Sequence, residues 1–264
     1  MATYTNTGSS TNLDDALGNP TLGGSDIVRI NEAGDSYSDG LTDLGTTAIA
    51  EFYLDPGFNG DVGNGTDAQV IQAGDMYLKS SSPNSVALQG VGSGTVALMH
   101  IEMLTAARVM LKNYTITKLR GISSGLVTIY GNTEVTSAYL GKAGQAMKFL
   151  AGTAMTLLTV APGCTAYLER DCVTVKNHGG TVLCQDATAT PETVESIGGR
   201  TQLLSGTVTI TSSGKTIIDL SKATGTLTIT WIVLGDTTIM SPPEGVTWNE
   251  PTDAQILGGK VSIV

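Results

Sequence analysis

The stretch Val173-Thr-Val-Lys-Asn-His-Gly-Gly-Thr-Val-Leu183 contains a short alternating run, a pair of glycines and a second alternating run. Alternation of this kind is the period of a β-strand, and β-branched side chains are favoured on a pleated surface. Two further stretches, Val127 to Val135 and Leu158 to Leu168, have the same order of strand, Gly-bearing corner and next strand. One coil of a β-solenoid requires this order, so the pattern predicts an all-β fold of stacked coils.

An apolar-Thr-apolar triplet opens the predicted strands in the second half of the chain. It occurs at residues 127–129, 158–160, 173–175, 208–210 and 227–229. The successive starts are 31, 15, 35 and 19 positions apart, which is compatible with irregular coils of about fifteen to twenty residues. We therefore expect a body like a right-handed parallel β-helix, in which small or β-branched side chains stack from coil to coil. An antiparallel β-sandwich or jelly roll explains the alternation nearly as well and is the alternative.

The composition indicates a core of small apolar side chains. Apolar residues make up 41% of the chain, whereas aromatic residues make up 5% and charged residues 14%. The 33 glycines are spread between short apolar runs, well above the average usage of about 7%. This distribution predicts many turns, with a core built from Val, Ile, Leu, Ala and Met.

Four regions are predicted along the chain. Residues 1–45 are rich in Gly, Ser, Thr, Asn and Asp and read as an extended acidic N-terminal arm, with one short strand at residues 26–30. Residues 46–94 form a Gly/Asp-rich β cap, and residues 95–240 form the solenoid-like body. Residues 241–264 begin with a segment that holds three prolines and read as a C-terminal tail or cap.

Two segments suit a helix as readily as a strand. Residues 96–111 and 142–150 are rich in Ala, Leu and Met, which are good helix formers. Both lie next to clear strand sequence, and propensity alone leaves the two interpretations open.

The net charge of −10 is unevenly distributed. Residues 1–75 hold twelve acidic side chains and one basic side chain, Arg29, so the remainder of the chain is close to neutral. This asymmetry suggests that the acidic part meets a basic surface or cations, and it argues against binding to nucleic acid phosphates. A solvated acidic surface that keeps the protein soluble is the alternative interpretation.

The N-terminus has no basic segment followed by an apolar run, and no apolar run reaches the length of a membrane helix. We expect a soluble product made in a cytoplasm, with no membrane partner; the alternative is that an export signal has been removed. The three cysteines Cys164, Cys172 and Cys184 are an odd number, which argues against a complete disulfide framework and fits a reducing site of synthesis.

No catalytic constellation is predicted. Gly121-Ile-Ser123-Ser-Gly125 matches a nucleophile elbow, but the residues after it read as a strand where the elbow needs a helix. Gly90-Val-Gly-Ser-Gly94 lacks the third glycine of a dinucleotide fingerprint and is read as a corner. Acid pairs for glycoside cleavage lack aromatic sugar platforms, since both tryptophans lie near the C-terminus. The candidate acids are Glu134, Glu169, Asp171 and Asp186.

The sequence evidence for a metal or cofactor site is equally weak. Cys164, Cys172, His178 and Cys184 supply zinc ligand types but lack the short Cys-x-x-Cys pair, so packing inside a solenoid is the better interpretation. The segment from Asp35 to Thr46 resembles the start of a calcium loop but has Tyr37 and Thr46 where oxygen ligands belong. A calcium site is possible in the loop with Asp55, Asn59, Asp61, Asn64 and Asp67, although a solvated turn is favoured. We predict no cofactor.

The loop from Asp55 to Asp67 and the following Val70-Ile-Gln-Ala-Gly-Asp75 are similar to the opening of many right-handed parallel β-helix proteins. As a whole, the acidic arm, the Gly/Thr/Val-rich strands and the few aromatics resemble bacteriophage virion proteins, especially trimeric head-decoration (cement) proteins and short β-helical fibres. The resemblance implies a non-enzymatic homotrimer that binds the major capsid protein through its N-terminal region and stabilises the capsid surface of the virion. The alternative is a tail fibre or tailspike that contacts a host surface glycan.

Overall fold

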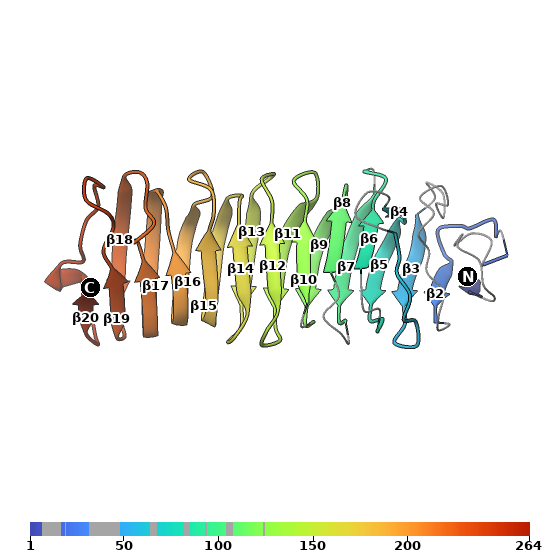
Figure 1. The fold of residues 1–264 in the computed structure, drawn as a ribbon, viewed down its shortest axis with the longest axis horizontal. Helices are drawn as coiled ribbons and strands as arrows, with labels where there is room; N and C mark the ends of the chain where they lie inside the picture. Colours follow the sequence, from blue (N-terminus) through green and yellow to red (C-terminus); the bar gives the residue numbers. More distant parts are fainter. Residues whose placement is uncertain are drawn as a thin grey trace. The chain divides into compact units, whose positions relative to one another are not determined.

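A computed structural model of the chain describes residues 1–6, 17–18, 20–31, 48–63, 68–81, 85–92, 94–103, 108–123 and 125–264. It is a parallel β-solenoid, nearly all of it strand and turn. The chain forms two compact units, Met1–Thr136 and Ser137–Val264. In Figure 1 the strands of each unit lie side by side as successive rungs. The predicted solenoid is confirmed, and the sandwich alternative is wrong because every pairing between strands within each unit is parallel.

The first unit contains two stacks of parallel strands. One stack runs through β1 (Thr3–Thr5), β2 (Ile27–Ile30), β3 (Ile49–Leu54), β5 (Ala73–Leu78), β7 (Thr95–Ile101) and β9 (Thr115–Gly121). The other runs through β4 (Gln69–Val70), β6 (Ser85–Gln89), β8 (Arg108–Lys112) and β10 (Leu126–Ile129). Two strands, β1 and β2, therefore lie in the region predicted as an arm; residues 7–16, 19 and 32–47 of that region lie outside the described residues.

The second unit has the same plan, with longer strands. One stack holds the end of β11 (Glu134–Leu140), β13 (Met155–Val160), the first halves of β15 (Cys172–Cys184), β16 (Pro191–Gln202) and β17 (Gly206–Asp219), and β18 (Leu227–Val233). The other holds β12 (Ala146–Phe149), β14 (Thr165–Leu168), the second halves of β15 to β17, β19 (Thr237–Met240) and β20 (Val261–Ile263). The two segments of ambiguous propensity contribute β7, β8 and β12, so each contains strand where it is described; residues 104–107 lie outside the described residues.

Alternate residues of each strand point inward and stack on their counterparts in the next coil. In the second unit one inner row is Leu158, Val175, Val194, Ile210 and Trp231, all at most 1% exposed. In the first unit an equivalent row is Val28, Phe52, Met76, Met99 and Leu119. Complete burial of such a side chain contributes about 1.5–3 kcal/mol. The outer row Thr174, Thr193, Thr209 and Thr230 confirms that β-branched residues stack from coil to coil.

The long strands of the second unit turn a sharp corner at a row of glycines. A methyl group on these glycines would collide with the backbone of the preceding coil: with Gly180 at Gly199, with Ile197 at Gly214, with Ser213 at Gly235 and with Gly235 at Gly259. Gly199 also has a φ of +80°, which only glycine adopts without strain. The corner is therefore a position where consecutive coils approach too closely for any side chain.

Buried polar side chains line the inside of the same corner. Asn177, which is fully buried, accepts from the N–H groups of Gly179 (3.1 Å) and Gly180 (2.8 Å) and donates to Thr201 Oγ1 (3.1 Å). In the next coil Ser196 donates to the Gly198 carbonyl at 3.0 Å. These bonds satisfy backbone groups that the bend removes from the ladder, and leaving such groups unpaired costs about 1–3 kcal/mol each.

The last coil covers the exposed edge of β18. The Asn249 side chain accepts from the Ile229 N–H at 2.7 Å and donates to the Ile229 carbonyl at 2.5 Å, so it replaces one residue of a partner strand. The buried Trp231 donates from Nε1 to the Asn249 carbonyl at 2.8 Å. Residues 247–249 therefore pair with an edge that would otherwise be open to other strands.

Gly199→Ala should lower the free energy of unfolding by more than Gly144→Ala does. Both glycines have positive φ, so both substitutions carry backbone strain of about 1–2 kcal/mol, but only Gly199 also faces the backbone of another coil. Urea unfolding followed by circular dichroism measures both changes. Equal losses for the two variants would contradict the close approach of coils at this corner.

Candidate functional site

A row of stacked aromatic and basic side chains lies on the outer face of the first unit. The Arg29 guanidinium lies 3.8 Å from the centre of the Tyr53 ring, and the Tyr53 and Tyr77 rings stack with centres 4.7 Å apart. His100 follows, with its ring centre 6.5 Å from that of Tyr77. Both faces of the Tyr53 ring are covered, by Arg29 and by Tyr77, so this ring stabilises the stacking of coils and offers no face to a sugar.

Charged partners hold this row in place. Asp55 pairs with Arg29 at 2.9 Å, and Tyr53 donates its hydroxyl to Glu51 at 2.5 Å. The hydrogen bond to the Glu51 carboxylate raises the pKa of Tyr53 to about 12. The tyrosine is therefore neutral at physiological pH.

Aspartates hold neighbouring coils together in both units. In the first unit Asp61 accepts from the Ser85 N–H and Asp75 from the Leu98 N–H, both at 3.0 Å. In the second unit the bonds are Thr190 N–H to Asp171 at 3.0 Å and Lys260 N–H to Asp236 at 3.1 Å. Part of the acidic composition is therefore structural, an interpretation that charge counting does not reveal.

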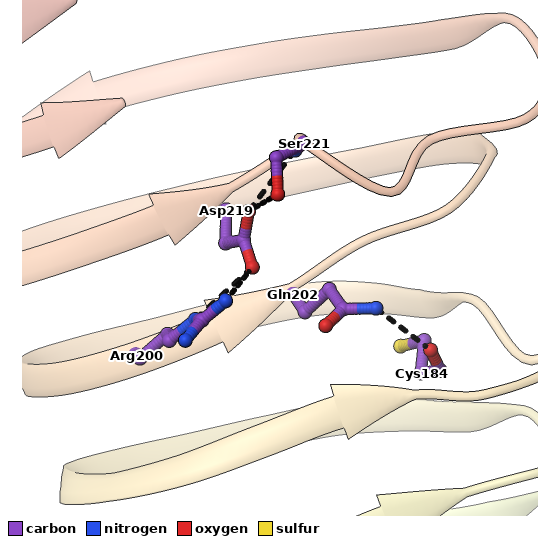
Figure 2. A network of polar contacts seen from close by, with 5 residues as sticks. All are labelled: Cys184, Arg200, Gln202, Asp219 and Ser221. Atoms are coloured by element: carbon purple, nitrogen blue, oxygen red, sulfur yellow. Dashed lines mark hydrogen bonds and ion pairs between the residues drawn. The ribbon is translucent and has the colours of Figure 1, made fainter. Parts of the chain in front are cut away.

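Arg200, Asp219 and Ser221 form a polar network on successive rungs of the second unit (Figure 2). The Asp219 side chain is fully buried, whereas that of Arg200 is 41% exposed. Asp219 accepts from Arg200 Nε at 3.0 Å and from the Ser221 N–H and hydroxyl at 3.0 and 2.7 Å. Burial alone would raise the pKa of Asp219, but the hydrogen bonds from Ser221 and Arg200 outweigh it and hold this pKa below its ordinary value.

A groove lies next to this network, on the outer face of β17, β19 and β20. Arg200 lies beside Ile217, and the groove, of about 420 Å³, extends from Ile217 towards the C-terminal coil. Its walls combine basic, acidic, hydroxyl and apolar side chains. The lining residues are Lys215, Thr216, Ile217, Asp236, Thr237, Thr238, Lys260 and Ser262.

A second hollow, of about 350 Å³, contains one of the acids considered for glycoside cleavage. Asp171 lies there with Glu192, beside Thr188, Thr190 and Ser205. The other candidate acids are elsewhere. Glu169 pairs with Lys148 at 2.8 Å, Asp186 accepts from Thr188, and Glu134 begins β11 in the first unit.

The three cysteines pack inside the second unit. Burial raises the pKa of Cys172 and Cys184 to about 12, so both thiols are protonated and poor metal ligands. Cys164 is also buried and donates to the Lys142 carbonyl at 3.1 Å, while His178 is exposed at the glycine corner. Within the described ranges, no three His, Cys, Asp or Glu side chains are grouped to hold a metal ion.

The remaining candidate motifs are connections between strands. Ser123 is buried between β9 and β10, so the matched elbow sequence leads from strand to strand as expected. Gly90 to Gly94 joins β6 to β7 and is a corner. In the candidate calcium loop Asp55 and Asp61 already have partners, whereas Asn64 and Asp67 lie outside the described residues, as does the segment from Asp35 to Thr46.

An apolar ridge follows the outside of the glycine corner. We define it as Ile197, Leu234 and Leu257, which are 57%, 47% and 67% exposed. Each is followed by a glycine, and the ladder pairs Ser196 with Ser212, Ser212 with Val233 and Val233 with Ile256. The row of following residues is therefore Ile197, Ser213, Leu234 and Leu257, in which the exposed Ser213 separates Ile197 from the adjacent Leu234 and Leu257. The sequence analysis did not predict this ridge, although each of its residues is a large apolar residue followed by glycine, in Ile-Gly-Gly, Leu-Gly-Asp and Leu-Gly-Gly.

Comparisons of the chain with protein-family models, curated proteins and solved structures found no match. The described part of the chain contains no helix long and apolar enough to cross a membrane.

The pH dependence of stability should include a contribution from Asp219. Because folding lowers its pKa, Asp219 stabilises the fold above the unfolded pKa of 3.8 and loses this contribution as pH falls through the lower folded value. Asp219→Asn should cost about 1–3 kcal/mol at pH 7, since Arg200 loses its carboxylate. Thermal unfolding of both proteins between pH 7 and 2.5 should show a smaller loss for the variant. Identical acid profiles would contradict this role.

Proposed function

We propose that this protein is a non-enzymatic structural component of a bacteriophage virion, which binds the capsid surface as a homotrimer and stabilises it. The observation that carries the proposal is the apolar ridge on a regular solenoid. Leu234 and Leu257 lie on adjacent coils, with Ile197 in the same row beyond Ser213, and these three exposed apolar side chains form a surface suited to burial against another protein. A closed threefold arrangement would bury one ridge from each copy.

The N-terminal acidic region supports attachment to a basic partner surface. Several of its acids already hold the fold: Asp26 accepts from the N–H groups of Ala2 and Gly23, and Asp55 pairs with Arg29. The acids at positions 14, 15, 32, 35, 39 and 43 fall in segments outside the described residues and are half of the twelve acids of residues 1–75. The partner would be a basic patch on the major capsid protein, since opposite charges speed encounter and fix orientation.

The mechanism is burial of surface across junctions between capsid subunits. Internal pressure must then break these added contacts before the shell opens. A solenoid suits this task because each coil is hydrogen-bonded to the next along its length, so a load at one rung is shared by its neighbours.

Full-length protein should sediment with capsids stripped of their accessory proteins and should raise the temperature at which these capsids release DNA. Asp35→Asn, Asp39→Asn and Asp43→Asn together should weaken this binding at least tenfold. A control with the same charge change, Glu244→Gln, Glu250→Gln and Asp253→Asn, should bind as the original protein does. Unchanged binding by the N-terminal variant would show that the anchor assignment is wrong.

The trimer depends on the apolar ridge. Ile197→Asn, Leu234→Gln and Leu257→Gln together should convert the trimer to monomer, because polar side chains remove the gain from burial. Sedimentation equilibrium measures the mass, and Leu126→Gln, which changes an apolar side chain 37% exposed outside the ridge, is the control. A monomeric original protein, or a trimer retained by the ridge variant, would contradict the assignment.

A second function, contact with a host surface glycan, is favoured by the groove beside β19 and β20. Grooves of this size accept a small ligand, and this one presents hydroxyl and charged groups together with an apolar side chain. This function does not require catalysis.

A further inference from the structure

The groove of the second unit contains two lysines that have no acidic partner. Lys215 and Lys260 lie on its walls, and among the described residues neither forms an ion pair. Other lysines of the same unit do: Lys148 pairs with Glu169 and Lys176 with Glu195. The two ammonium groups are therefore available to an anionic ligand.

Register places the two lysines on either side of an acid. Thr216 pairs with Thr237 and Thr237 with Val261, so the residues immediately before them form the row Lys215, Asp236, Lys260. Adjacent strands are about 4.8 Å apart, and the backbones of the two lysines are therefore about 10 Å apart. A ligand that spans two or three coils contacts both lysines.

Asp236 selects against ligands that carry only negative charge. Its Oδ1 accepts from the Lys260 N–H at 3.1 Å, which leaves Oδ2 to accept from a ligand hydroxyl. Residues 137–264 hold eight basic and ten acidic side chains, so the unit as a whole repels polyanions. A fitting ligand combines hydroxyl donors with an isolated anionic group.

The second row of the groove supplies the remaining contacts. Ile217, Thr238 and Ser262 are in register on successive strands, and Ile217 is 38% exposed. The apolar side chain can pack against the C–H face of a sugar ring, while the two hydroxyls can donate to and accept from sugar hydroxyls.

From this arrangement we infer that the groove binds an acidic sugar, a hexose that carries a carboxylate, within a short oligosaccharide. Lys215 and Lys260 hold the carboxylate, Asp236 and the hydroxyls of Thr238 and Ser262 bind the ring hydroxyls, and Ile217 supports the ring. The inference rests on the second proposed function, glycan contact, and is independent of capsid attachment.

Calorimetric titration of the full-length protein with uronic acid disaccharides and trisaccharides (galacturonate, glucuronate and mannuronate) tests the ligand class. At least one series should bind, more weakly as salt is added, and its methyl esters, which keep the shape but lose the charge, should bind at least tenfold less tightly. The double variant Lys215→Gln with Lys260→Gln should bind the uronic acid at least tenfold less tightly than the original protein does. Lys222→Gln, an exposed turn lysine outside the groove, should bind normally.

Each other outcome overturns the inference in a distinguishable way. If the uronic acids and their methyl esters bind equally tightly, and Ile217→Asp abolishes this binding, the groove is a site for neutral sugars. The acidic sugar would then be the wrong ligand class, while the proposed contact with a glycan would stand. Equal competition by acetate would mean a simple anion site. If no uronic acid series binds, the inference fails, and binding of the protein to intact host surface polysaccharide then decides whether glycan contact fails with it.

Discussion

Parallel, in-register hydrogen bonding of each coil to the next is the constraint on which the rest of this structure depends. It places equivalent residues about 4.8 Å apart in rows, so each row must contain side chains that tolerate one another. Inside, the rows are apolar, as in Leu158, Val175 and Val194. At the corner they are glycine, backed by Asn177 and Ser196, because a bend in a buried strand leaves backbone groups that need partners.

The same constraint creates the surfaces with functional potential. Register turns single residues into lines: Arg29, Tyr53 and Tyr77 in the first unit, and Lys215, Asp236 and Lys260 in the second. In the first line the side chains contact one another, and these contacts stabilise the stacking of the coils. The second leaves two ammonium groups unpaired, which is why we assign ligand binding there.

The strands could be predicted from the sequence, but their register could not. Alternation and the apolar-Thr-apolar triplets identified the β10, β13, β15, β17 and β18 strands. Coil length, however, varies from 16 residues between Thr193 and Thr209 to 24 between Thr3 and Ile27, so no fixed repeat aligns one coil with the next. Propensity left residues 96–111 open between helix and strand, and stacking on neighbouring coils explains the strands β7 and β8 found there. The groove and the ridge depend on register and therefore required the structure.

Disulfide cross-linking of paired positions on adjacent coils tests the stacking most directly. Lys176 pairs with Glu195 on the outer face of β15 and β16, so Lys176→Cys with Glu195→Cys should form an intramolecular disulfide under mild oxidation. Thr193 is displaced by two residues, about 8 Å away, and Lys176→Cys with Thr193→Cys should stay reduced. Efficient cross-linking of the displaced pair, with none for the in-register pair, would contradict the stacked parallel solenoid.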